Sequence, residues 1–142
     1  MAKKMMRVGI IPREEYWKRT IAIAKGEYVP KRDEPKIWFE SLQAMAQVLS
    51  SENQQLLKTI IDLKPKSIKE LEFITGRKSS NLSRTLKTME RYGIVELLKQ
   101  KKTVIPKVNV TDFTVEFGLS HQARGGKRKG LRSEDLGLRA ED

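Results

Sequence analysis

Apolar residues in the middle of the chain recur at helical intervals. In residues 50–63 they repeat every three or four positions, which predicts an amphipathic helix. Either Ser50 or Ser51 is placed to cap its start, and Pro65 ends it. The apolar positions of this helix are Leu56, Leu57, Ile60, Ile61 and Leu63.

Residues 67–76, SIKELEFITG, predict a second and shorter helix. Ser67 followed three positions later by Glu70 is a capping-box pattern, and Gly76 is a typical residue after a helix end. The positions expected to be buried are Ile68, Leu71 and Ile74.

The stretch at residues 76–93 predicts a third helix. We expect Ser79 or Ser80 to be its N-cap and Gly93 to end it. Its start is rich in hydroxyl and amide side chains, which are mediocre helix formers, so a role beyond helix formation is indicated. The apolar stripe that would face the core is Leu82, Leu86 and Met89.

The period changes after residue 93. Residues 94–118 are rich in β-branched and aromatic residues, and QKK at residues 100–102 separates two apolar segments, which predicts a β-hairpin tip. Pro106 places the second strand at an edge or breaks it there. Three short helices followed by a hairpin are the order of a winged helix-turn-helix, so we expect a mixed α/β (α+β) fold of this kind.

The first 45 residues contain a predicted strand at residues 6–11, a helix from Pro12 to Gly26, and an apolar cluster at residues 37–39 before a helical run. Aromatic residues are frequent interface anchors, so we expect a homodimer here. The alternative is that these side chains cover the back of the winged helix. The interface residues expected are Tyr16, Trp17, Ile21, Ile37, Trp38 and Phe39.

The chain divides into three predicted regions. Residues 1–45 form an N-terminal strand-helix dimerisation arm, and residues 46–118 form the winged-helix DNA-binding domain. Residues 119–142 have glycines, mixed charges and few large apolar residues, which predicts a flexible basic tail. GGKRKG at residues 125–130 lacks the pattern of a phosphate-binding loop and is a basic patch.

The formal net charge of +11 favours an anionic polymer as partner. Residues 76–102 hold eight basic and only two acidic residues, and these lie on the third helix and the hairpin tip. A winged helix lays these two parts on double-stranded DNA, where Asn pairs bidentately with adenine and Arg with guanine. The expected DNA-binding residues are Arg77, Lys78, Ser79, Ser80, Asn81, Ser83, Arg84, Lys87, Thr88, Arg91, Lys101 and Lys102.

Several classes of site are disfavoured. The absence of cysteine excludes disulfides and Cys-rich zinc sites, and the single His121 cannot build a His-based metal centre alone. No apolar run is long enough to span a membrane, and the N-terminal run is too short for a secretory signal, so we expect a cytoplasmic protein. We find no catalytic constellation and expect neither enzyme activity nor a cofactor.

The stretch SSNLSRTLKTMERYGIVE resembles the recognition-helix pattern of winged-helix repressors of the MarR and ArsR type. The wider pattern, over about residues 8–118, is similar to a MarR-like family that includes antitoxins paired with TumE-type toxins. This resemblance implies a homodimeric DNA-binding regulator and an antitoxin that represses its own operon. The residues that carry it are Ser83, Arg84, Leu86, Met89, Glu90, Gly93, Ile94 and Val95.

Two other functions stay open at this stage. One is an adaptor whose winged helix binds protein, and the other is a protein that binds nucleic acid, including RNA, without reading its sequence. RNA recognition usually stacks bases on exposed aromatic rings, and Tyr92 is the only aromatic residue in the third helix and hairpin tip. The charge excess on these same parts favours DNA over a protein partner.

Overall fold

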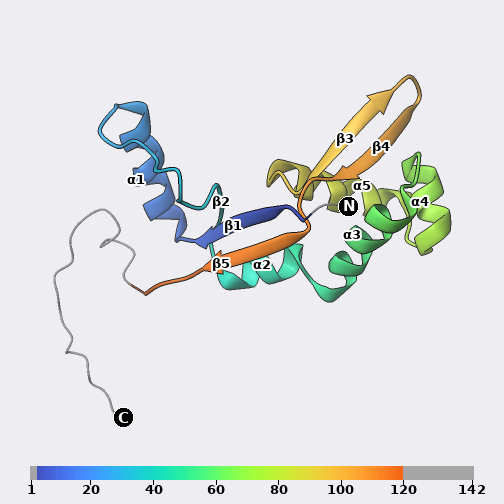
Figure 1. Ribbon diagram of the computed structural model, residues 1–142, viewed down its shortest axis with the longest axis horizontal. Coiled ribbons are helices and arrows are strands. Elements are labelled where there is room, and N and C mark those ends of the chain that lie inside the picture. The colour runs from blue at the N-terminus through green and yellow to red at the C-terminus, as the bar shows by residue number, and fades with distance from the viewer. Residues whose placement is uncertain (1–2, 120–142) are drawn as a thin grey trace, which may run out of the picture.

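The computed structural model describes residues 3–119 and has the mixed α/β class expected from the sequence (Figure 1). Helices and short strands alternate at the start, three helices follow one another, and strands close the described part. The elements are β1 (Met5–Ile10), α1 (Arg13–Ala24), β2 (Ile37–Phe39), α2 (Leu42–Val48), α3 (Ser51–Leu63), α4 (Ile68–Thr75), α5 (Ser79–Arg91), β3 (Val95–Gln100), β4 (Thr103–Val108) and β5 (Asp112–Glu116).

Two predicted caps start α3 and α4. The Ser50 hydroxyl accepts a hydrogen bond from the backbone N–H of Asn53 at 3.2 Å, and Ser67 accepts one from the N–H of Glu70 at 2.9 Å. The Glu70 carboxylate accepts in return from the N–H of Lys66 at 2.6 Å, one residue before the usual capping-box donor. Both helix starts therefore satisfy backbone donors with local side chains, as the sequence predicted.

The start of α5 differs from the prediction. Lys78 is the N-cap, with φ −68° and ψ 147°, and its side chain makes no capping hydrogen bond. The expectation that Ser79 or Ser80 caps this helix is wrong, because the helix already begins at Ser79. The chain leaves α4 through Gly76 at φ 76°, so only two residues separate that glycine from the first turn of α5.

The larger core lies among α3, α4, α5 and the β3–β4 hairpin. The stripe of α5 faces it as predicted, since Leu82, Leu86 and Met89 are fully buried together with Leu71 of α4. One position expected to be buried is wrong, because Ile74 near the end of α4 is 37% exposed. Leu63, an apolar position of the predicted repeat, is the last residue of α3 and is 59% exposed. Each lies where its helix ends.

The predicted hairpin is confirmed. β3 and β4 pair antiparallel, and Gln100 lies opposite Thr103, so Lys101 and Lys102 form a two-residue turn. Lys101 has φ 52°, a left-handed conformation that is strained for a residue with a side chain. The two strands form a sheet of their own, so Pro106 of β4 lies on an edge strand, one of the two situations expected.

The second sheet was not predicted. β1 lies between β2 and β5 and pairs parallel with both, in the order β2-β1-β5. The apolar cluster at residues 37–39 is therefore a strand, with Val8 opposite Ile37 and Ile10 opposite Phe39. Since β5 follows the hairpin, the N-terminal arm and the end of the expected DNA-binding region share this one sheet.

A smaller core under this sheet joins the larger one. It contains Val8, Ile10, Ile37 and Phe39, all buried. The Phe39 ring stacks on Tyr92, just after α5, with the ring centroids 4.3 Å apart and the planes at 29°. This contact fixes the end of α5 to the sheet.

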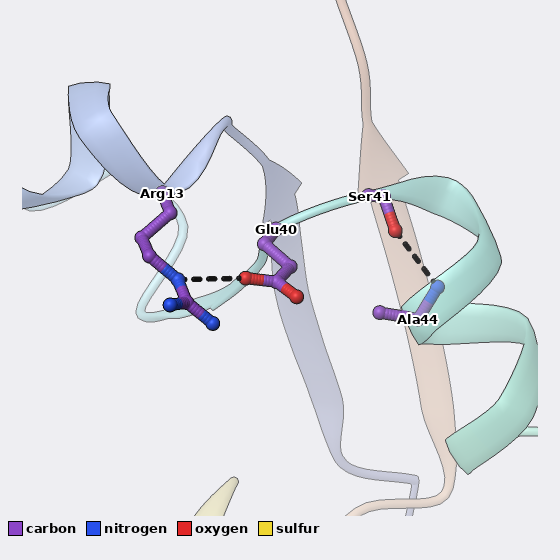
Figure 2. A network of polar contacts seen from close by, with 4 residues as sticks. All are labelled: Arg13, Glu40, Ser41 and Ala44. Carbon is purple, nitrogen blue, oxygen red and sulfur yellow. Dashed lines mark hydrogen bonds and ion pairs between the residues drawn. The ribbon is translucent and has the colours of Figure 1, made fainter.

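Helix α1 projects from the end of the sheet opposite the hairpin (Figure 1) and has no buried residue. Polar contacts hold it near its flanking segments. Arg13 donates to Glu40 at 3.2 Å, beside the Ser41 cap of α2 (Figure 2), and the part-buried Arg19 donates to Glu34 at 2.8 Å. Its guanidinium carbon also lies 5.0 Å from the centroid of the Trp38 ring.

Gly9 of β1 makes room for the Trp38 side chain. A Cβ atom at this glycine would lie 2.4 Å from the indole ring, a distance that side chains do not tolerate. The bare glycine backbone therefore allows the indole to lie against the sheet. None of the helices in residues 3–119 has the length and apolar character needed to cross a bilayer. The predicted tail, His121 and the 125–130 patch lie outside the described residues, apart from Leu119.

Candidate nucleic-acid interface

The face of α5 opposite the core is polar and basic. Ser80, Arg84, Lys87 and Arg91 follow one another at intervals of three or four residues, so they share one side of the helix. All four are exposed, while the stripe on the other side is fully buried. The apolar packing therefore fixes which side chains α5 presents outward.

These cations have no acidic partner within the described part of the chain. The four ion pairs among residues 3–119 join Arg7 to Glu116, Arg13 to Glu40, Lys18 to Glu15 and Arg19 to Glu34, and none of them involves α5 or the hairpin. The carboxylate of Glu90 on α5 instead accepts a hydrogen bond from the backbone N–H of Leu97 at 3.2 Å. The positive charge of α5 therefore faces solvent unneutralised.

The hairpin tip carries a second cationic group. Lys101 and Lys102 are both exposed at the turn, and the hairpin extends away from the helices (Figure 1). Glu90 ties β3 to the C-terminal half of α5, so helix and hairpin are held in a fixed relation at their shared base. The basic residues of α5 and those of the hairpin tip therefore lie on elements that this hydrogen bond joins.

The N-terminus of α5 has no side-chain cap, unlike those of α3 and α4. Serine hydroxyls accept from first-turn N–H groups in α3 and α4, as Ser41 does in α2, whereas no side chain caps α5. Uncapped N–H groups and the positive end of the helix dipole suit an anion. Lys78, Ser79 and Ser80 lie exposed at this end.

Arg77 has a different place from the one expected. Its part-buried guanidinium holds side chains of its own chain: Nε donates to Asn81 Oδ1 at 2.8 Å, and Nη1 and Nη2 each lie 3.3 Å from Asn53 Oδ1. Nη2 also lies 3.3 Å from the hydroxyl of Thr85, which is half-buried. Arg77 connects α3 to the start of α5 and is not a freely exposed cation.

Three other residues predicted to bind DNA are half-buried or already hydrogen-bonded within the chain. Ser83 and Thr88 are only half exposed, and the Thr88 hydroxyl donates to the backbone carbonyl of Arg84 at 3.0 Å. Asn81 is exposed although Arg77 holds its oxygen. The exposed members of the predicted set are Lys78, Ser79, Ser80, Asn81, Arg84, Lys87, Arg91, Lys101 and Lys102.

The six residues expected at a dimer interface separate into two groups. Tyr16, Trp17 and Ile21 of α1 are exposed, Trp17 by 62%. Ile37 and Phe39 are buried in the core of their own chain, so the expectation is corrected for these two side chains. Trp38 is half-buried between them, against Gly9 and Arg19.

Sequence reasoning missed two features of this region. Asn53 is 24 positions from Arg77, and no local pattern indicates their contact. An open groove of about 770 Å³ runs between α3 and the α4–α5 connection, lined among others by Gln55, Thr59, Ile74 and Lys78.

No group of three or more metal-ligating His, Cys, Asp or Glu side chains occurs within residues 3–119.

One family model, described as HVO_A0114, matches residues 48–115. The match begins at the end of α2 and covers α3, α4, α5, the hairpin and most of β5, so the chain is similar to that family over the part that carries the basic surfaces. No curated protein matches the chain, and no solved structure does either.

Proposed function

We propose that this protein is a sequence-specific, double-stranded DNA-binding transcriptional regulator that acts as a dimeric repressor in the cytoplasm. In this proposal α3, α4, α5 and the β3–β4 hairpin form a winged helix-turn-helix. Helix α5 is the recognition helix that enters the major groove, and the hairpin tip contacts the backbone or the minor groove.

The observation that carries the proposal is the outward face of α5. A buried apolar stripe orients the helix, and the opposite side presents Arg84, Lys87 and Arg91 with no ion pair to another described residue. Unpaired cations repel one another, so such a face adds little to the stability of the fold. The same cations increase the affinity for a polyanion such as DNA. The uncapped helix start and the lysines of the hairpin tip extend the same surface.

The dimer is proposed through α1. A helix of 12 residues with no buried side chain is marginal in water by itself, and it exposes Tyr16, Trp17 and Ile21. A second copy packed against this face would cover the aromatic side chains and bring two recognition helices to one operator. Trp17→Ala is expected to shift the protein toward monomer in sedimentation analysis at micromolar concentration, and an unchanged oligomeric state would exclude this interface.

The test of DNA binding is a fluorescence anisotropy titration with a duplex from the protein's own promoter and a scrambled duplex of the same length, over a salt series. The promoter is expected to bind at least about a hundredfold tighter, within the usual range of specific over non-specific binding. Arg84→Ala is expected to remove about 1–3 kcal/mol of that margin. Arg32→Ala is the matched control, since it removes the same charge from the exposed segment between α1 and β2.

Equal binding of both duplexes, with affinity that falls steeply with salt, would replace sequence recognition by non-specific polyanion binding. Absence of binding to either duplex would favour the alternative of an adaptor that binds protein. The antitoxin role rests on the resemblance alone. It predicts that a toxin encoded beside this gene copurifies with the protein and that their complex binds the promoter.

A further inference from the structure

Arg77 fixes the direction in which two asparagine side chains point. Arginine has five N–H donors and no acceptor, so an amide that bonds to it must turn its oxygen toward the guanidinium. Asn53 Oδ1 lies 3.3 Å from both Nη1 and Nη2, and Asn81 Oδ1 lies 2.8 Å from Nε. The chemistry of the donor thereby assigns the oxygen and nitrogen of both amides.

The other end of Asn53 agrees with this assignment. Its Nδ2 donates to the backbone carbonyl of Val48 at 3.0 Å and lies 3.4 Å from that of Gln47, both at the C-terminal end of α2. Carbonyl groups accept and do not donate, so they also require the nitrogen on that side. The amide of Asn53 is therefore held from both sides, and it holds Arg77 in turn.

The same reasoning sets what Asn81 offers to a partner. Its oxygen is held by Arg77, and its Nδ2 amide group, on an exposed residue of the first turn of α5, makes no hydrogen bond to another residue of 3–119. Two N–H donors remain available at the helix end that the proposed function places in the major groove. Arg77, Asn53 and the end of α2 form the support behind them.

We propose, resting on the proposed function, that Asn81 is a donor-only contact that selects guanine, whose N7 and O6 are two adjacent acceptors, over adenine, which presents N7 beside a donor amino group. Bidentate pairing with adenine, the contact that the sequence suggested for this asparagine, needs the amide oxygen to accept from the adenine amino group. The guanidinium of Arg77 already donates to one of the two lone pairs of that oxygen, and an amino group that donated to the other would lie beside a positive charge. Arg77 is thus a positioning residue that sets specificity through Asn81.

The experiment is a selection of binding sites from a randomised duplex library by the full chain and three variants. Asn81→Ala identifies the base position that residue 81 contacts, because the preference there is lost. At that position the wild type is expected to prefer guanine. Arg77→Ala releases the amide and is expected to shift the preference toward adenine by roughly tenfold, the scale of one bidentate contact.

Asn81→Asp keeps the proposal testable if Arg77→Ala does not fold. Its carboxylate still accepts from Arg77 Nε, so α5 keeps its support, but both N–H donors are gone. The preference at the same position is expected to move from guanine to cytosine, whose amino group is a donor. Thermal unfolding monitored by circular dichroism establishes that each variant is folded at the selection temperature.

Selection of adenine by the wild type at this position, or a preference that residue 81 does not affect, would overturn the inference and leave the proposed function standing. Enrichment of no sequence at all by the wild type would overturn both. A general loss of affinity in Arg77→Ala with an unchanged order of bases would reduce Arg77 to a structural residue, since only positioning of Asn81 changes which base is chosen.

Discussion

Replacement of the two hairpin-tip lysines, one at a time, by glycine separates backbone strain from charge. Lys101 has φ 52° in a two-residue turn, whereas Lys102 has no positive φ. The left-handed conformation costs a residue with a side chain about 1–2 kcal/mol, and glycine adopts it freely. Glycine also adds about 0.5–1 kcal/mol of conformational entropy to the unfolded chain, which lowers stability.

The two substitutions should therefore change stability in opposite directions. Lys101→Gly is expected to raise the free energy of unfolding by up to about 1 kcal/mol, because the relief of strain exceeds the entropy cost. Lys102→Gly has the cost without the relief and is expected to lose about 0.5–1 kcal/mol. Both variants lose one lysine from the same exposed turn, so each is the charge control of the other.

The assay is thermal and urea unfolding of the two variants beside the wild type. A difference of 1 kcal/mol corresponds to roughly 3–5 °C in Tm for a domain of this size. Equal changes of the same sign would refute the reasoning, since they would mean that Lys101 is not left-handed in solution. If the tip contacts phosphates, each variant should also lower the salt slope of DNA binding by about one.

Three further substitutions, one of them with a matched control, test the fold. Leu86→Ala removes a fully buried side chain of α5 and is expected to cost about 2–5 kcal/mol in urea unfolding; a cost below 1 kcal/mol would contradict the packing of this helix. Gly9→Ala places a methyl group against the Trp38 ring and is expected to cost about 1–3 kcal/mol with a change in tryptophan fluorescence, whereas Gly118→Ala, in open space, should be nearly neutral. Lys64→Gly, at the C-cap of α3 with φ 46°, is expected to raise Tm by a few degrees, and a lower Tm would argue against that left-handed cap.

The sequence predicts the part of the fold that local rules determine. The serine caps at Ser50 and Ser67, the buried stripe of α5 and the hairpin turn at residues 100–102 all follow from patterns within about a dozen residues. The same locality explains the error at the start of α5. Two serines in the first turn indicate a cap. The position of the helix start also depends on Gly76, at which α4 ends, and on the contacts of Arg77.

The parallel sheet and the Arg77 contacts could not be predicted, because their partners are far apart in the sequence. A three-residue strand at residues 37–39 has no period to detect, and only its pairing with β1 makes it a strand. Asn53 reads as an ordinary polar residue of a helix start, yet its amide supports Arg77 from another helix. The charge pattern of the sequence indicates the basic face. Only the structure shows that Arg84 is exposed, whereas Arg77 is part-buried and bonded to other side chains of the chain.

The place of β1 in the sheet has a consequence for synthesis of the chain. β1 leaves the ribosome before the other elements of residues 3–119 and is the central strand of its sheet, whereas its neighbour β5 is the last of these elements to emerge. The hydrogen bond from the Lys4 N–H to the Thr111 hydroxyl joins residues 107 positions apart. The contacts of α3, α4, α5 and the hairpin are much more local, so they are expected to form first on the nascent chain. Until residue 116 emerges, the edge of β1 that pairs with β5 exposes unpaired backbone N–H and C=O groups, which is the point at which a truncated or stalled product would aggregate.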